Sequence, residues 1–165
     1  AKAIASYCNG GTFKALHALP PYVLLSPDDP LARRDRLTPE DLVDRPMVLL
    51  DLPHSAEYFM SHFHHLGRRP RISERTNEVA VQRSLVASGY GFGITNMRTI
   101  STESLDGRPL KFVPLESDVE PLRLGLAMSK VAHVSRTIQA FMDHCHEAAD
   151  NGGLPGIVIT PPNAS

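Results

Sequence analysis

The stretch LVASGYGFGI, residues 85–94, decides the fold of this chain. The apolar spacing around its start predicts a helix over residues 77–88, which Gly89 ends. That helix places three residues on one side: Val81, Leu85 and Ser88. Residues 91–95, which follow the glycine, predict a strand. A helix that stops at a glycine and leads at once into a strand is typical of folds in which the two kinds of element alternate.

The residues upstream repeat the same alternation. The run MVLL, residues 47–50, has no polar alternation, as expected of a strand covered on both faces in a parallel sheet. After it, a helix is predicted from a Ser55 cap to a stop at Gly67, and residues 71–76 predict another strand. The apolar positions of that helix are Phe59, Phe63 and Leu66. Three strands alternating with helices imply right-handed crossovers and a parallel sheet, so the predicted fold class is α/β.

Weaker signals lie on either side of this central part. Thr38 followed by Pro39 and two acids is a helix start, with Thr38 as N-cap, and a short helix is expected to about Val43. Residues 3–7 predict a strand, and a second one ends in the run YVLL at residues 22–25. These elements extend the α/β pattern toward the beginning of the chain.

The last third of the chain predicts two more strands and a helix. The strands are expected over residues 110–115 and 122–128, the second with clear alternation. An amphipathic helix begins near Ser135, and the tail over residues 151–165, rich in Gly and Pro, is expected to be frayed. The apolar side of the helix is Val134, Ile138, Phe141 and Cys145, which makes Cys145 a core residue.

Composition narrows the class of protein. A chain of 165 residues suits one domain or two small lobes, and 17 basic against 18 acidic residues leave no net positive field to hold a DNA backbone. Cys8 and Cys145 lie far apart, which favours reduced thiols and a cytoplasmic protein. No apolar run approaches the roughly 20 residues that cross a bilayer. Because the chain opens at Ala1 without an initiator Met, it is interpreted as an excerpt of a longer protein.

Several short strings, in this order, resemble the regulatory domain of LysR-type transcription regulators. The strongest is residues 85–94, similar to the family passage lVaaGlGia. Residues 29–32, DPLA, stand where the family has HPLA, with Asp in place of the usual His, and residues 38–42, TPEDL, resemble the short helix that follows. Residues 121–124, PLRL, are similar to the strand by which the family's chain returns to its first lobe. The resemblance covers most of residues 3–148.

The resemblance implies a two-lobed fold of the periplasmic-binding-protein type II kind. It assigns residues 1–26 and 119–150 to an incomplete first lobe and residues 27–118 to the second, with 151–165 as a tail. It also implies a sensor without catalytic activity or cofactor, which binds a small-molecule effector between the lobes. The partners implied are a second copy in a homodimer, often a tetramer, and promoter DNA through an N-terminal winged helix-turn-helix that this sequence lacks.

Candidate binding residues follow from the way open parallel sheets bind ligands. The ligand sits outside the carboxyl ends of the strands, where helix N-termini present free N–H groups, and such a site suits an anionic or carboxylate effector. The resemblance turns the end of the first strand toward the same cleft. The candidates are Ser6, Tyr7, Pro53, His54, Ser55, Tyr58, Thr76, Asn77, Glu78, Thr95 and Asn96.

Each candidate also has a structural interpretation. Ser55, Thr76 and Asn77 are good N-caps, and capping alone accounts for them. Tyr58 suits packing at the edge of a lobe, whereas Glu78 would repel an anion and suits a solvent-facing position. The remaining polar candidates are equally typical of strand ends: Ser6, Tyr7, Thr95 and Asn96.

Two other classes of protein compete with the sensor. A free-standing solute-binding protein would share the fold and bind a ligand without regulating transcription. A metal-dependent enzyme is suggested by the histidines near Glu57, but no HExxH motif or further ligand closes a tetrahedral set, and histidines on a solvated face are the preferred interpretation. Those histidines are His54, His62, His64 and His65. The sequence has no GxSxG motif or P-loop, which disfavours a hydrolase or nucleotide-binding enzyme.

Overall fold

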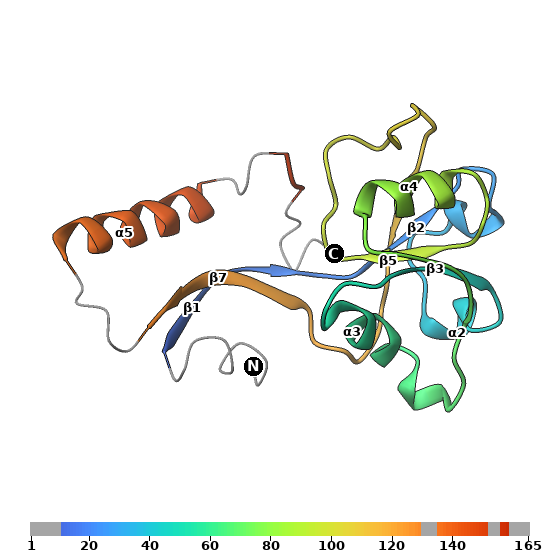
Figure 1. The fold of residues 1–165 in the computed structure, drawn as a ribbon, viewed down its shortest axis with the longest axis horizontal. Coiled ribbons are helices and arrows are strands. Elements are labelled where there is room, and N and C mark those ends of the chain that lie inside the picture. Colours follow the sequence, from blue (N-terminus) through green and yellow to red (C-terminus); the bar gives the residue numbers. More distant parts are fainter. Residues whose placement is uncertain (1–10, 130–134, 152–155, 159–165) are drawn as a thin grey trace. The chain divides into compact units, whose positions relative to one another are not determined.

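A computed structural model describes residues 11–129, 135–151 and 156–158 (Figure 1). The chain divides into two compact units, one of residues 20–121 and one of residues 1–19 with 122–165. The strand predicted over residues 3–7 lies outside the described residues. The sequence-based lobe boundary after residue 26 differs from the division after residue 19, because the strand at Tyr22–Leu25 pairs with two strands of the larger unit.

The larger unit is built on a three-stranded and a two-stranded sheet, which one parallel bridge joins into a mixed sheet of five strands. Strand β2 (Tyr22–Leu25) lies between β5 (Gly93–Thr95) and β6 (Lys111–Pro114) and is antiparallel to both. Strands β3 (Pro46–Leu50) and β4 (Arg71–Thr76) pair in parallel. A parallel bridge from Met47 to Phe92 joins β3 to the start of β5. The sheet order is therefore β6, β2, β5, β3, β4, and the α/β prediction is confirmed.

Helices cover both faces of this sheet, as the uninterrupted apolar run in β3 predicted. Met47 and Leu49 face a core shared with α2 (Pro39–Leu42) and α3 (Ser55–Ser61), to which Phe59 of α3 and Phe63 just beyond it contribute. Val48, which points the other way, packs against α4 (Val79–Ala87). Short 3-10 turns lie at η1 (Pro30–Arg33) and η2 (His64–Leu66).

Glycine is required at Gly91, within the string that predicted the fold. Its φ of 152° is in a region that side chains rarely adopt, and a Cβ there would lie 2.3 Å from the carbonyl oxygen of Pro46. The close approach lets the Phe92 N–H donate to that carbonyl oxygen at 3.0 Å, while the Val48 N–H donates to the Phe92 carbonyl at 2.8 Å. The sheet is continuous from β5 to β3 because these two strands meet there.

The smaller unit contains a two-stranded antiparallel ribbon and one long helix. Strands β1 (Thr12–Leu19) and β7 (Leu122–Met128) pair along their length, with an irregularity between Ala15 and His17. Helix α5 (Arg136–Asp150) packs against β1. Its start is as predicted, since the side chain of Ser135 accepts a hydrogen bond from the Ile138 N–H at 3.2 Å.

Several helix details differ from the sequence-based expectations. In α4 the fully buried residues are Gln82 and Val86, whereas Val81 is 45% exposed and Ser88 is exposed, so the predicted inner side was wrong for these two. The helix sits on the sheet through the side that carries Gln82, which donates to the Val48 carbonyl at 3.0 Å. A buried amide with a backbone partner outweighs the apolar pattern at this position.

The predicted buried side of α5 also needs correction. Phe141 is 60% exposed, while its neighbour Met142 is buried. Cys145 is a free thiol of intermediate burial and does not lie in the core. Among the described residues the helix packs against β1 of the two-stranded ribbon, and a surface that narrow covers few of its side chains.

Candidate functional site

The carboxyl ends of four strands lie along one edge of the sheet in the larger unit. Strands β3, β4 and β5 run in parallel, and β6 runs with β5 because both are antiparallel to β2. At this edge the Asp51 N–H donates to the Thr76 carbonyl at 2.8 Å, which closes the ends of β3 and β4 together. We call this the carboxyl edge. Helix α3 begins there after β3, and helix α4 begins there after β4.

The turn into α3 presents Pro53 and His54 to solvent. His54 has φ 66° and ψ −17°, the left-handed conformation that costs a residue with a side chain roughly 1 to 2 kcal/mol. It occupies the N-cap position that the sequence assigned to Ser55, and Ser55 is the first helical residue. The Ser55 N–H donates to the Leu52 carbonyl at 3.0 Å, so this turn is held by its own backbone. Strained loop backbone of this kind is concentrated at binding sites.

The turn into α4 is closed by Thr76. Its hydroxyl oxygen accepts a hydrogen bond from the Glu78 N–H at 3.1 Å. Glu78 is the N-cap residue, and its side chain makes no capping hydrogen bond. Asn77 and Glu78 are both exposed. The capping interpretation was therefore wrong for Thr76 and for Asn77: Thr76 closes the turn that precedes the helix, and the N-cap position belongs to Glu78.

Two candidates from distant parts of the chain contact each other at the carboxyl edge. Asn96, which follows β5 and is 6% exposed, donates through Nδ2 to the Tyr58 hydroxyl at 3.0 Å. The Tyr58 hydroxyl in turn donates to the Glu120 carbonyl at 3.2 Å. Thr95, the last residue of β5, is 9% exposed, and its hydroxyl oxygen accepts from the Met97 N–H at 3.2 Å. Tyr58 thus links the end of β5 to the segment that leaves β6.

That segment, residues 115–121, is called the return segment here. The Glu116 N–H donates to the Leu37 carbonyl at 2.8 Å, and the Leu115 N–H donates to the Pro21 carbonyl at 3.0 Å. With the Tyr58 hydroxyl, these bonds attach the return segment to the body of the larger unit.

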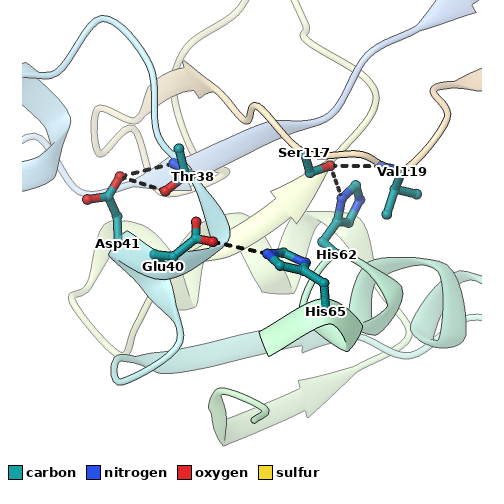
Figure 2. A network of polar contacts seen from close by, with 7 residues as sticks. All are labelled: Thr38, Glu40, Asp41, His62, His65, Ser117 and Val119. Carbon is teal, nitrogen blue, oxygen red and sulfur yellow. Dashed lines mark hydrogen bonds and ion pairs between the residues drawn. The ribbon is translucent and has the colours of Figure 1, made fainter. Parts of the chain in front are cut away.

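His62 makes a further contact with the return segment that the sequence analysis missed (Figure 2). The His62 side chain is 0% exposed, and its Nδ1 lies 2.6 Å from the Ser117 hydroxyl, which also accepts from the Val119 N–H at 3.4 Å. Burial lowers the pKa of the His62 imidazole to about 4, so the ring is neutral at pH 7. The Tyr58 ring meets it edge-on, with centroids 5.1 Å apart.

The interpretation of His62 as a solvated surface residue was therefore wrong. Its position four residues after Tyr58 and three after the buried Phe59 was the available signal, because residues three and four apart lie on the same side of a helix. His65 behaves as predicted and lies on the surface. Its Nε2 is 3.0 Å from the Glu40 carboxylate, a contact that lowers the pKa of that carboxyl to about 2.

Arg98 is a second residue that the sequence analysis did not single out. It lies three positions beyond the end of β5, is half-buried, and holds its guanidinium carbon 5.8 Å from the centre of the Tyr22 ring. Tyr22 begins β2 directly opposite Thr95, so this pair lies at the carboxyl edge. A cation placed over an aromatic ring gains about 0.5 to 1 kcal/mol, and this contact uses none of the N–H donors of the guanidinium as a hydrogen bond.

Ser6 and Tyr7 lie outside the described residues. Across the ranges that the structure describes, no group of three or more His, Cys, Asp or Glu side chains is placed to hold a metal ion. In the same ranges no helix has the length and apolarity to span a membrane.

Comparison with known proteins relates this geometry to a family. The chain is 32% identical over 77 residues to the HTH-type transcriptional regulator TtuA of Agrobacterium vitis, a match that covers 45% of this chain and 25% of TtuA. Its structure superimposes on that of HinK, a LysR family transcriptional regulator from Pseudomonas aeruginosa, with a TM-score of 0.77 and 29% identity over 83% of this chain and 48% of HinK. The chain thus spans at most about half the length of either protein.

A third likeness is one of fold alone. The effector-binding domain of BenM, solved with its effector benzoate, has a TM-score of 0.66 and 20% identity over 93% of this chain and 68% of that domain. The sequence model of the family described as LysR substrate binding domain matches residues 10–150 of this chain. The predicted periplasmic-binding-protein type II fold is confirmed. The chain belongs to the LysR substrate-binding-domain family and is a LysR-type effector-binding domain.

Proposed function

We propose that this chain senses a small metabolite at the carboxyl edge of its larger unit and thereby controls DNA binding by the regulator to which it belongs. The observation that carries the proposal is the meeting of Tyr58 and Asn96 there. They come from different segments, are joined at 3.0 Å, and stand beside the starts of two helices. Polar groups that converge at the ends of parallel strands are typical of ligand sites in α/β proteins.

The binding residues proposed are those at or near this edge. Pro53, His54 and Ser55 would meet the ligand from the turn into α3, and Thr76, Asn77 and Glu78 from the turn into α4. Thr95, Asn96 and Tyr58 would form the floor between them. Ser6 and Tyr7 remain predictions for the smaller unit, whose lobe assignment also remains a proposal. Binding of benzoate by BenM supports a carboxylate as the ligand.

A further part of the proposal concerns the intact regulator. It would act without catalysis, in the cytoplasm, as a homodimer or tetramer that contacts promoter DNA through a winged helix-turn-helix outside this sequence. A ligand can change DNA affinity only by binding one arrangement of the protein more tightly than another. The hydrogen bonds from Tyr58 and His62 to the return segment support α3 as the element that responds, because the same helix begins at the carboxyl edge.

The test combines ligand binding with DNA binding. Small carboxylates and aromatic acids are screened by thermal shift on the 165-residue chain, since a ligand of the folded form raises the melting temperature. Each hit is then added to the full-length gene product, and the affinity for its own promoter region is measured. A saturable ligand that changes this affinity by about fivefold or more is expected. The absence of any stabilising ligand, or turnover of one, would contradict the proposal.

A further inference from the structure

Arg98 is fixed at the carboxyl edge by contacts that leave its charge unneutralised. Its guanidinium stacks on the Tyr22 ring, and the ion pairs formed among the described residues do not include it. Other arginines near this edge have partners: Arg75 pairs with Asp51 at 3.1 Å. A half-buried guanidinium without a carboxylate is a ready site for an anion, because its planar N–H groups bind two oxygens at once.

A second arginine holds the loop that carries Arg98. Arg83, in the middle of α4, donates to the Thr99 hydroxyl at 2.7 Å and to the carbonyls of Ser101 and Glu103 at 2.8 and 2.6 Å. These three hydrogen bonds all go to the loop, and the guanidinium carbon of Arg83 also lies over the Phe112 ring, 5.5 Å from its centre. The N–H donors of Arg83 therefore hold the loop in place, whereas Arg98, the residue before Thr99, keeps its N–H donors for a ligand.

The surroundings of Arg98 add positive potential. Tyr22 points to the same face of the sheet as Leu24, which packs against Val86 of α4. The N-terminus of α4, with its positive dipole end, therefore lies on the same face and at the same edge as Arg98. Glu78 is the acid at that helix start, and as an exposed side chain it is screened by water and salt.

We propose that Arg98 is the residue of this chain that recognises a negatively charged group, a carboxylate or phosphate, on the effector. The inference rests on the proposed function and deepens it, since it assigns the ligand class and the residue that selects it. A neutral molecule of the same shape would leave the guanidinium unneutralised in a half-buried position and would bind less well.

The experiment compares an anion with its neutral isostere. Benzoate, benzamide and inorganic phosphate are titrated into the 165-residue chain, with sodium chloride at matched ionic strength as the control, and the Arg98 Nε–Hε signal is followed by NMR. Benzoate and phosphate are expected to move this signal saturably, while benzamide and chloride leave it in place. If neither anion moves it, or if benzamide binds as tightly as benzoate, the proposal fails.

Substitutions then identify the side chain responsible. Arg98→Gln is expected to weaken benzoate binding by at least about tenfold, the loss of one charge-assisted contact, and Arg98→Lys by less because it keeps the charge without the planar fork. Arg33→Gln makes the same charge change in η1, which follows the opposite end of β2, and should have no effect. Unchanged affinity in Arg98→Gln, with melting temperature preserved, overturns the assignment.

The two proposals can fail separately. A ligand from the effector screen that binds wild type and Arg98→Gln equally, and still alters promoter binding, would contradict the role of Arg98 and support the proposed function. If anions bind through Arg98 but never change the affinity for the promoter, the anion site is supported and the proposed sensor function is contradicted.

Discussion

Helices α3 and α4 follow parallel strands of the same sheet in the same way, yet their side chains have different partners. Helix α4 is fixed within its own neighbourhood, through Gln82 to β3 and through Arg83 to the loop beyond β5. Helix α3 instead reaches the return segment through Tyr58 and His62. The two helices have the same place in the order of elements but different roles. Helix α4 is a fixed support of the sheet, and α3 links the sheet to the return segment.

The largest expected difference between the two helices is in the free energy of unfolding that is lost when a buried core side chain is truncated. Phe63, which follows α3, is 0% exposed and lies 6.4 Å from Phe92 between ring centroids, whereas Val86 of α4 is equally buried but smaller. Phe63→Ala should lower the free energy of unfolding by about 4 kcal/mol, and Val86→Ala by about 2 kcal/mol. Urea unfolding followed by circular dichroism measures both. Equal losses would show that α4 supports the sheet as strongly as α3 does.

Glycine substitutions test the close approach of β5 to β3, the two strands against which these helices pack. Gly91→Ala places a Cβ 2.3 Å from the Pro46 carbonyl oxygen and should cost about 3 kcal/mol, since backbone must move. Gly89→Ala, at φ 83° with nothing within 4 Å, should cost only about 1 kcal/mol. The comparison uses the same urea assay. Similar effects at the two positions would exclude the close approach as the reason for Gly91.

The dependence of stability on pH also distinguishes the two helices, because α3 ends at His62, a buried titratable side chain. The pKa of His62 is lowered from 6.5 to about 4 in the folded state, so between these values the unfolded chain binds more protons. The free energy of unfolding should therefore fall as the pH drops from 6.5 to 4, by about 2 kcal/mol from this group. His62→Gln keeps a polar partner for Ser117 and should lose that part of the acid dependence. Identical pH profiles in wild type and His62→Gln would contradict the buried neutral imidazole.

The smallest expected effect is that of the Tyr58 hydroxyl. Tyr58→Phe removes the hydrogen bonds to the Glu120 carbonyl and from the Asn96 amide while keeping the ring, and should cost about 1 kcal/mol of stability. Hydrogen exchange of the return-segment amides should increase in this variant, while that of α4 amides stays as in wild type. Faster exchange in α4 alone would mean that Tyr58 is not a link to the return segment.

The sequence alone determined the fold class and the order of the strands and longer helices from Tyr22 onward, whereas the separate strand β1 was not predicted. Its strongest signals were local: the apolar run in β3, the helix start at Thr38 and the glycines between α4 and β5 depend on periodicity and backbone preference within a few residues. The same signals placed the candidate site at the strand ends. They could not assign Gln82 or His62 to the interior, because a polar residue is buried only when a partner distant in sequence satisfies it.

Only the tertiary structure decided which polar side chains meet. Tyr58 and Asn96 are 38 positions apart and Arg98 stacks on a ring 76 positions away, pairs that no local pattern encodes. The physical reason is that strand pairing brings the ends of β2, β3 and β5 to one edge, and pairing between distant segments depends on the packing of the whole unit. The sequence specifies the elements and the edge, and packing selects the residues that act there.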